Sequence, residues 1–276
     1  MGDPMAAHVL VAGHELMVHD IDREKGRRLE TAGACWSDAP MTVASECEVV
    51  ITCLPGPQEV EAVVLGDEGV FAGLAPRSTY LDTSTNRPSV MRRIADLGAK
   101  RGIHVLDAPI SGGMAGAAEG TLTIFVGGAE ADLERVRPLL QTFGQRIVHA
   151  GPSGCGHVVK LINNAMMFVS FLGSCEGIAM GDRAGIDPKV LLNAIAPSMG
   201  QSRIFERTLA TFLAGEEFGF SPHLAAKDMR LVVELGKELG VPLEVSSRVR
   251  DVMTRFRDTA DPDADVFTEM IRDYLK

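Results

Sequence analysis

Regular alternation of strand-like and helix-like segments, followed by its abrupt end, constrains the fold of this chain more than any other feature. Between residues 15 and 150, short runs rich in apolar and β-branched residues recur at intervals long enough for a helix. We expect strands at residues 16–19, 49–54, 79–82, 104–108, 122–126 and 147–150. Strands separated by helices predict βαβ units, and therefore a mostly parallel sheet.

Beyond Gly154 the strand pattern gives way to helical periodicity. Helix starts are expected at Asp187-Pro188, Ser221-Pro222 and Asp261-Pro262, and helix ends at Gly185, Gly200 and Gly240. The predicted organisation is an α/β domain over residues 1–152 followed by an all-α domain over residues 153–276. A long apolar helix from about Gly154 to Ala184 leads the second domain.

Length and charge limit the classes of partner. A chain of 276 residues with 46% hydrophobic and 23% charged residues can build two cores. Its net charge of −10 argues against nucleic acid or an anionic membrane surface, since both attract basic patches. An acidic small molecule remains compatible, because a few local cations and backbone amides can override the overall charge.

The five cysteines are scattered and never form a CxxC pair, which is typical of a reduced intracellular chain without structural zinc. We therefore expect a cytoplasmic protein with no metal site. Cys155 lies at a helix start, where a thiolate is favoured, but no His or Asn partner is evident and packing is the preferred role. The most apolar run, residues 161–173, is too short for a membrane span and favours a buried core helix.

Lys160 and Asn164 are the strongest candidates for chemistry. They are one helical turn apart on the apolar segment that follows the loop of residues 151–156, so both side chains share one helix face. A lysine between Val159 and Leu161 loses solvation when its helix is buried, which favours the neutral amine and proton transfer near neutral pH. The alternative is a lysine that extends to solvent beside a hydrogen-bonded core asparagine.

A glycine-rich segment, residues 107–120, lies between the last strands of the first domain. Its closely spaced glycines let the backbone approach a ligand, and successive amides with the Ser111 hydroxyl can bind a carboxylate. An ordinary connection between strands explains the same composition.

Two further segments follow predicted parallel strands, at the edge where open α/β sheets bind ligands. They contain Leu54-Pro55 and Thr83-Ser84-Thr85, which also suit plain strand-to-helix turns. Lys227-Asp228 lies in a predicted helix and suits a solvated charge pair equally well.

Gly2 precedes a helical pattern, and Asp20 follows the first expected strand eighteen positions later. This spacing is close to that between the last glycine of a GxGxxG turn and the acid that binds the adenosine ribose. Gly2 alone is a weak signal, and Asp20 can equally start a loop.

Taken together, these segments resemble the β-hydroxyacid dehydrogenase family, of the 3-hydroxyisobutyrate dehydrogenase and tartronate semialdehyde reductase type, over essentially the whole chain. The similar segments are residues 107–113 with Gly116 and Gly120, Gly154-Cys155-Gly156 with Lys160 and Asn163-Asn164, Lys227-Asp228-Met229, and residues 1–6. The resemblance implies a Rossmann-like domain followed by a helical domain. It also implies an NAD(P)-dependent oxidoreductase that interconverts a small 3-hydroxy acid and its semialdehyde.

By this resemblance Lys160 is the general acid/base, and the substrate is bound by Ser111, Gly112, Gly113 and Asn164, with Asn164 orienting the reacting oxygen and the glycine segment binding the carboxylate. The resemblance further assigns the dinucleotide to Gly2, Asp20, Leu54, Pro55, Thr85 and Lys227. A carboxylate at position 20 accepts from ribose hydroxyls and repels a 2′-phosphate, so NAD is expected. Arg23 nearby keeps NADP open.

One departure concerns the first strand and the Gly-x-Gly that precede Met-Gly in the family. We expect this chain to be truncated relative to a functional parent, with a gap in the sheet and part of the pyrophosphate site removed. Restoring about ten upstream residues should then raise NAD affinity.

Other functions remain open. They are a tartronate semialdehyde reductase-like enzyme, a catalytically silent scaffold of the same fold, and an imine reductase, against which the lysine at position 160 argues. Because the helix over residues 154–184 is too apolar for one small domain to cover, we expect a homodimer or homotetramer.

Overall fold

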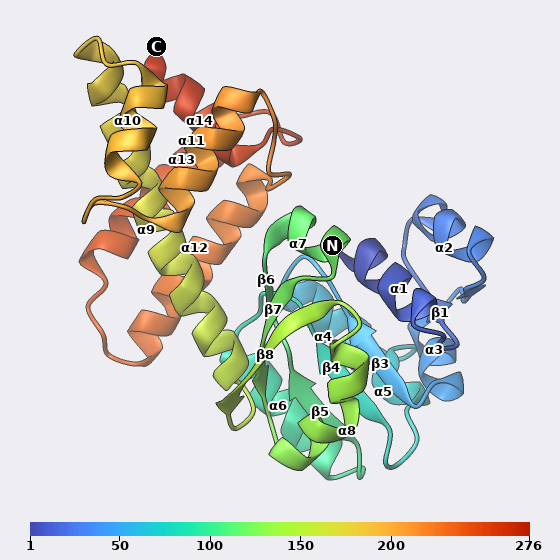
Figure 1. The fold of residues 1–276 in the computed structure, drawn as a ribbon. Coiled ribbons are helices and arrows are strands. Elements are labelled where there is room, and N and C mark those ends of the chain that lie inside the picture. The colour runs from blue at the N-terminus through green and yellow to red at the C-terminus, as the bar shows by residue number, and fades with distance from the viewer. The chain divides into compact units, whose positions relative to one another are not determined.

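The chain forms two compact units in a computed structural model that describes residues 1–276 (Figure 1). The first unit is Met1–Lys160 and the second is Leu161–Lys276. The first contains every strand, and the second contains only helices and their connections. The expected mixed α/β fold class, with a mostly parallel sheet and a helical C-terminal part, is confirmed.

The main sheet of the first unit has six strands. They are β3 (Val49–Thr52), β4 (Thr79–Asp82), β5 (His104–Asp107), β6 (Ile110–Ser111), β7 (Leu122–Gly127) and β8 (Gly144–Gly151). The order is β3-β4-β5-β7-β6, with β8 also paired to β7. The β3–β4, β4–β5 and β7–β8 pairs are parallel, whereas β7 runs antiparallel to β5 and β6. Strand β6 lies inside the glycine-rich segment, for which the sequence predicted no strand.

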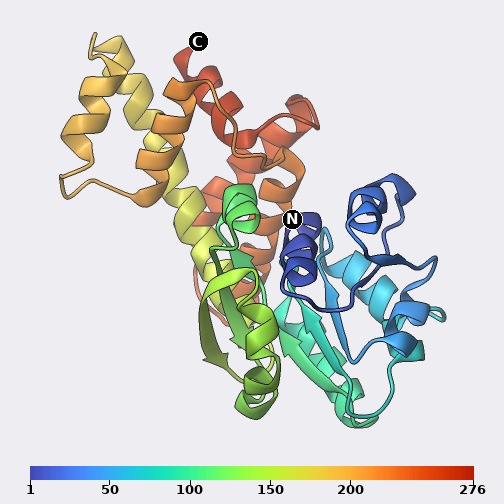
Figure 2. The ribbon, with the colours of Figure 1, turned by 45° about the vertical axis from the view of Figure 1, so that its right-hand side comes forward.

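A separate two-stranded sheet is formed by β1 (Met17–Val18) and β2 (Cys35–Trp36), which pair in parallel. Strand β1 does not pair with β3, so each of these two strands has a neighbour on one side only. In Figure 2 the blue segment that carries β1 and β2 lies on the β3 side of the main sheet, away from the green β8. Strands β1 and β2 thus form a sheet of their own beside the main sheet.

Helices flank the sheets of the first unit. They are α1 (Gly2–Val11), the 3-10 helix η1 (Arg23–Gly26), α2 (Arg27–Thr31), α3 (Pro40–Glu46), α4 (Pro57–Leu65), α5 (Val70–Gly73), α6 (Pro88–Ala99), α7 (Gly113–Glu119) and α8 (Glu130–Leu140). Proline opens α3, α4 and α6, where its missing N–H would have no intrahelical partner.

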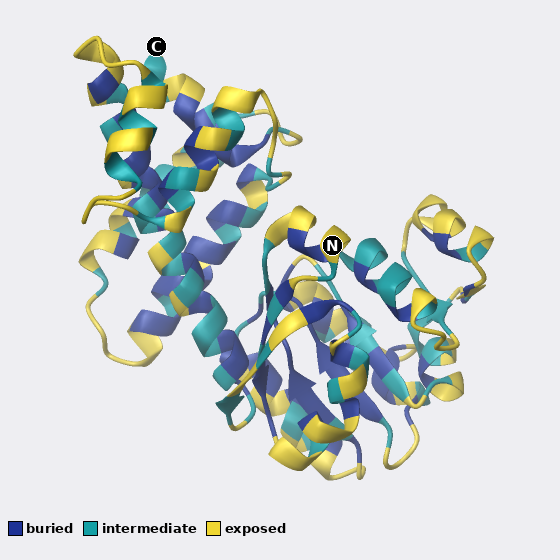
Figure 3. Cartoon of the chain, viewed as in Figure 1, coloured by how far each residue is buried: buried dark blue, intermediate teal, exposed yellow.

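Two apolar cores lie on opposite faces of the main sheet. Tyr80 and Val105 belong to the core that contains helices α4 and α6, whereas their chain neighbours Leu81 and Leu106 belong to the core that contains α1 and α8. This division follows from the alternation of side chains along a strand. Figure 3 shows the result, with strands β4 and β5 in the buried colour and exposed positions on the outer helix faces. The carboxyl ends of these buried strands are therefore rigidly placed.

Helix α9 (Cys155–Arg183) begins in the first unit and continues into the second. The second unit also contains α10 (Pro188–Ile195), α11 (Arg203–Ala214), α12 (Pro222–Glu238), α13 (Glu244–Thr259) and α14 (Val266–Leu275). By length and composition alone α9 would suffice to cross a membrane. Its buried Phe171, however, packs against Phe267 of α14 at 4.7 Å between ring centroids, which supports a core helix.

Two of the three expected helix starts agree with the structure. Asp187 caps α10 and Ser221 caps α12, each accepting a hydrogen bond from an amide of the first turn. The start at Asp261-Pro262 is wrong, because α14 begins at Val266 and is capped by the buried Asp265. The end expected at Gly200 is also displaced, since α10 ends at Ile195 and a turn follows.

Candidate active site

The loops after β3 and β4 meet at the carboxyl edge of the sheet. The Leu54 amide donates to the Ser84 hydroxyl at 2.9 Å, which joins the loop of Leu54 and Pro55 to the loop of Thr85. Pro55 is exposed and Thr85 is half-buried. The three residues predicted to contact the dinucleotide on these loops are thus held close together on a fixed edge, as parallel strands require.

Beneath this edge lies the fully buried carboxylate of Asp82, the last residue of β4. It accepts hydrogen bonds from the Thr52 hydroxyl at 3.1 Å, the Ser84 amide at 3.0 Å and the Asn86 side chain at 3.0 Å. The His157 ring nitrogen Nε2 lies 3.5 Å away. Burial raises the pKa of Asp82, but His157, Ser84 and Asn86 together outweigh burial and hold its pKa below the usual range.

Asp107, the last residue of β5, holds the start of α9. Its buried carboxylate accepts from the Gly154 amide at 2.7 Å and the His157 amide at 3.1 Å. Glycine is needed on both sides of this contact, since a Cβ at Gly127 would lie 2.6 Å and one at Gly156 would lie 2.8 Å from a carboxylate oxygen. A carboxylate at a helix N-terminus satisfies otherwise unpaired amides and interacts favourably with the helix dipole.

Lys160 is half-buried on α9, three residues after His157. The first turn of this helix is anchored to β5 through Asp107 and lies against β4 through the His157–Asp82 contact. The amine therefore projects from a helix whose start is fixed to the same sheet edge as Leu54 and Thr85. Asn164 follows one turn later on the same helix.

In the second unit Asn164 belongs to a buried polar cluster with α12. Its side-chain amide donates to Asp228 Oδ2 at 2.7 Å, and its oxygen accepts from Asn163 at 3.0 Å. The Lys227 ammonium lies 2.9 Å from the other oxygen of Asp228. The buried Asp228 thus orients both Asn164 and Lys227, two residues that the sequence assigned separately to substrate and cofactor.

The glycine-rich segment is more structured than a loop. Ser111 ends β6, and α7 begins two residues later at Gly113. Gly112 and Gly113 have φ angles of 144° and 70°, which residues with a side chain rarely adopt. The two glycines therefore let the backbone turn sharply between Ser111 and the first turn of α7. The structure therefore brings Ser111, Gly112 and Gly113 together at one turn.

At the other end of the unit, Asp20 follows β1 and is partly exposed. One oxygen accepts from the Asp22 amide at 2.9 Å. Gly2 opens α1, whose N-cap residue Met1 makes no side-chain capping bond, so amides of its first turn remain for a ligand. A partly exposed carboxylate acceptor and an uncapped helix N-terminus suit the ribose diol and pyrophosphate of a dinucleotide, which fits this chain to such a cofactor.

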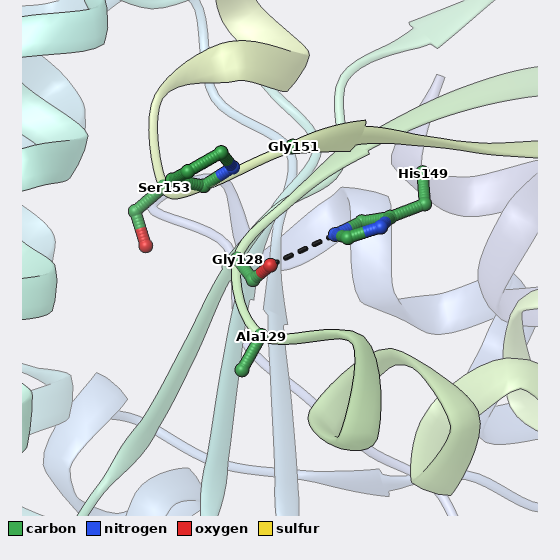
Figure 4. Close-up of a pocket in the computed structure, with 6 residues that line it drawn as sticks. Gly128, Ala129, His149, Gly151 and Ser153 are labelled. Carbon is green, nitrogen blue, oxygen red and sulfur yellow. Dashed lines mark hydrogen bonds between the residues drawn. The ribbon is translucent and has the colours of Figure 1, made fainter.

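A surface depression of about 350 Å³ lies near the carboxyl ends of β7 and β8 (Figure 4). It is lined by Gly128, Ala129, His149, Gly151, Pro152 and Ser153. The His149 ring nitrogen Nε2 forms a hydrogen bond with the Gly128 carbonyl oxygen at 2.9 Å, which gives this side chain a structural role. None of the residues predicted for the site lines this depression.

Sequence reasoning missed three buried residues of the first unit that hold the start of α9. These are Asp82, Asp107 and His157. Asp82 and Asp107 were visible as acidic residues at the ends of apolar strands, where a buried charge needs a purpose. His157 had no comparable signal, because a histidine within a helix is ordinary. Asp228 was named beside Lys227, but its burial contradicts the solvated charge pair that the sequence also suited.

Comparison with known proteins agrees with this geometry. A family model for the NAD-binding domain of 6-phosphogluconate dehydrogenase matches residues 1–151. A second model, for the NAD-binding domain of NADP-dependent 3-hydroxyisobutyrate dehydrogenase, matches residues 154–274.

Similar curated proteins and a similar solved structure are also named as dehydrogenases. A 3-hydroxyisobutyrate dehydrogenase of Pseudomonas aeruginosa is 40% identical over 200 residues, which cover 72% of this chain and 67% of the relative. An NAD-dependent L-serine dehydrogenase of the same organism is 38% identical over 242 residues, covering 85% and 81%. The structure of a Mycobacterium tuberculosis 3-hydroxyisobutyrate dehydrogenase with L-serine has a TM-score of 0.90 at 27% identity and covers 100% of this chain and 96% of that one.

The two family models meet near the start of α9, and the relatives extend across both units. The expected family and the use of NAD(P) are confirmed. The chain belongs to the β-hydroxyacid dehydrogenase family of NAD(P)-dependent oxidoreductases, which act on the CH–OH group of hydroxy acids.

Proposed function

We propose that this protein interconverts a small 3-hydroxy acid and its semialdehyde, with Lys160 as the general acid/base. The observation that carries the proposal is the anchoring of α9, because Asp107 and Asp82 fix the helix that bears Lys160 to the sheet edge of Leu54 and Thr85. An anchored, half-buried amine meets the requirement that a proton-transfer group be held in place.

The proposed roles follow from the chemistry of each side chain. During alcohol oxidation the neutral amine of Lys160 takes the hydroxyl proton, and in reduction it returns that proton to the carbonyl oxygen. Asn164, oriented by Asp228, donates to the reacting oxygen, while Ser111, Gly112 and Gly113 bind the carboxylate. A bound nicotinamide supplies the hydride acceptor.

We assign the dinucleotide to residues 1–152, through Gly2, Asp20, Leu54, Pro55 and Thr85, with Lys227 contributing from the second domain. Residues 153–276 supply Asn164 and the assembly surface. The uncapped start of α1 and the partly exposed carboxylate of Asp20 support this division.

The names of the relatives suggest a substrate class. 3-Hydroxyisobutyrate and L-serine are both small carboxylates with a hydroxyl on the third carbon. We propose that this chain takes a substrate of that class. Tartronate semialdehyde, a small carboxylate with its aldehyde on the third carbon, is the second candidate, and a catalytically silent scaffold is the alternative that lacks turnover.

Steady-state kinetics test the proposal. The full chain is assayed with 3-hydroxyisobutyrate, L-serine and tartronate semialdehyde, with NAD and NADP in the oxidative direction and NADH and NADPH in the reductive one. Lys160→Ala should lower kcat by about 10²–10⁴-fold, the range for a lost general acid/base. Lys189→Ala, on the exposed α10, is the matched control and should leave kcat unchanged. Equal activity of Lys160→Ala and the parent, with unchanged circular dichroism, would exclude the role of Lys160.

We also propose a homodimer or larger assembly through α9. Its outer face carries the exposed side chains of Ile162, Met166 and Met180, of which Met166 and Met180 are 68% and 70% exposed. Gly173 and Gly177 lie on the same face with open space around them, which permits close approach of another helix. Light scattering of Met166→Lys tests this surface, since a single charge there should favour the monomer.

A further inference from the structure

Arg23 follows Asp20 by three residues, and its guanidinium is paired with a carboxylate and lies over an aromatic ring. It opens η1, the first helical segment after β1. Its two terminal nitrogens donate to the two carboxylate oxygens of Glu30, with the Nη2–Oε2 distance at 2.6 Å. The guanidinium carbon lies 4.3 Å from the centroid of the Trp36 ring. Both terminal nitrogens of Arg23 therefore donate to Glu30 and one face of its guanidinium lies over Trp36, although the side chain is 49% exposed.

The surroundings fix this arrangement. Gly26 lies against the Trp36 ring so closely that a Cβ would be 2.5 Å from ring atoms. Trp36 also pairs in register with Val18 of β1 and donates from its ring nitrogen to Asp38 at 2.7 Å. Because the Trp36 ring packs against Gly26, it gives Arg23 a fixed face beside β1, and Glu30 holds the guanidinium there as an ion pair.

The other cations of this segment are paired as well. The distance from the side-chain nitrogen to the nearest carboxylate oxygen is 3.9 Å for Lys25 and Asp20, 2.6 Å for Arg27 and Glu24, and 2.6 Å for Arg28 and Asp3. The hydrogen bonds from Arg23 lower the pKa of Glu30, and those to Glu30 raise the pKa of Arg23. The Arg23–Glu30 pair therefore stays ionised throughout the neutral range.

We propose that Glu30 determines the choice between NAD and NADP by withholding Arg23 from a phosphate on the 2′ oxygen of the adenosine ribose. The inference rests on the proposed cofactor site at Asp20. An arginine binds a phosphate bidentately through a pair of parallel N–H donors, and the two terminal nitrogens of Arg23 must leave Glu30 before they can bind a phosphate in this way. Glu30 acts through Arg23 and is a positioning residue. Asp20 repels the same phosphate directly, so the two acids favour NAD by different means.

A double-mutant cycle separates the release of Arg23 from the loss of the negative charge of Glu30. Glu30→Ala frees Arg23 and also removes a negative charge, and either change favours a phosphate. If release of Arg23 is the cause, the gain must vanish when Arg23→Ala is combined with Glu30→Ala. Glu24→Ala is the matched control, because it removes an equal charge from the neighbouring η1 and breaks only the pair with Arg27.

The test uses the full chain and the adenosine halves of the two cofactors. Dissociation constants are measured by calorimetry for 5′-AMP and for adenosine 2′,5′-bisphosphate, so that the readout does not depend on turnover. Glu30→Ala should improve the preference for the bisphosphate about fivefold, which is the order of one exposed ion pair. Glu24→Ala and the Arg23→Ala/Glu30→Ala double variant should not improve it.

Three results would overturn the inference. An unchanged preference in Glu30→Ala, while 5′-AMP still binds as in the parent, refutes the role of Glu30 and leaves the proposed function intact. A gain that persists without Arg23, or an equal gain in Glu24→Ala, shows that overall charge is the cause. Failure of both nucleotides to bind the parent chain refutes the cofactor site itself.

Discussion

Replacement of Asp107 tests directly how the chain holds the helix of Lys160. In Asp107→Ala the buried amides of Gly154 and His157 lose their acceptor, at a cost of about 1–3 kcal/mol each. Loss of a carboxylate at the helix N-terminus adds about 0.3–2 kcal/mol. The free energy of unfolding should therefore fall by about 4 kcal/mol. Asp107→Asn keeps one acceptor oxygen, so it should lose about half of that amount.

Urea unfolding followed by the fluorescence of Trp36 measures the effect. Trp36 is the only tryptophan in the chain and lies in the first unit, as does Asp107. The exposed Asp96 of α6 supplies a matched control, because Asp96→Ala should change stability by less than about 0.5 kcal/mol. Losses below about 1 kcal/mol for both Asp107 variants would refute the reasoning, since α9 would then be held by other contacts.

Three further outcomes are expected from other parts of the site. Because the pKa of Asp82 is lowered in the folded protein, its contribution to the free energy of unfolding is complete above the ordinary carboxyl pKa of about 3.9 and is lost as pH falls through the lower folded value. Asp82→Asn should therefore weaken the pH dependence of the free energy of unfolding between pH 5 and 2. An unchanged pH dependence would contradict the lowered pKa of Asp82. Asp228→Asn should raise KM for the hydroxy acid about tenfold with a smaller change in kcat, because the amide keeps only one of the two acceptor oxygens that orient Asn164 and Lys227; an effect on kcat alone would speak against orientation. Met180→Lys should shift the assembly toward monomer in light scattering, whereas Met114→Lys, an exposed methionine of α7, should not.

The main strands were predictable because each is a short apolar run bounded by turn residues. Residues 79–82 match the structure at both ends, and residues 122–126 differ by one. The strands Cys35–Trp36 and Ile110–Ser111 were missed because each has two residues, too few for any periodicity. They are defined by backbone pairing with a distant strand, which leaves no local pattern.

The start of α14 shows a different limit. Asp261-Pro262 has the local form of a helix start, but the structure uses Asp265, which accepts from the Phe267 amide at 3.2 Å and from the Phe218 amide at 2.6 Å. The second bond joins residues 47 apart in the chain. A cap that also ties down a distant loop is favoured over one that only caps, and a local pattern cannot reveal that difference.

Some features of the candidate site were likewise predictable from the local sequence, and others were not. The helical spacing of Lys160 and Asn164, and the strand-end positions of Leu54 and Thr85, follow from local periodicity and were predictable. Their catalytic and binding roles stay predictions. The contact of Asp107 with Gly154 joins residues 47 apart, and that of Asn164 with Asp228 joins residues 64 apart. Long-range polar contacts of this kind depend on the tertiary fold and could not be deduced from spacing.

The buried acids at the sheet edge make most sense as positioning devices. Thr52, Asp82 and Asp107 are neighbours in register across three parallel strands, each as the last residue of its strand. Two adjacent buried carboxylates cost desolvation and repel one another, and apolar residues of similar size would often give equal or greater stability. What apolar residues cannot do is accept the amides of Gly154 and His157 and so fix the direction of α9. Asp82 and Asp107 therefore lower the stability of the fold but fix the position of Lys160. A proton-transfer group depends on such a fixed position.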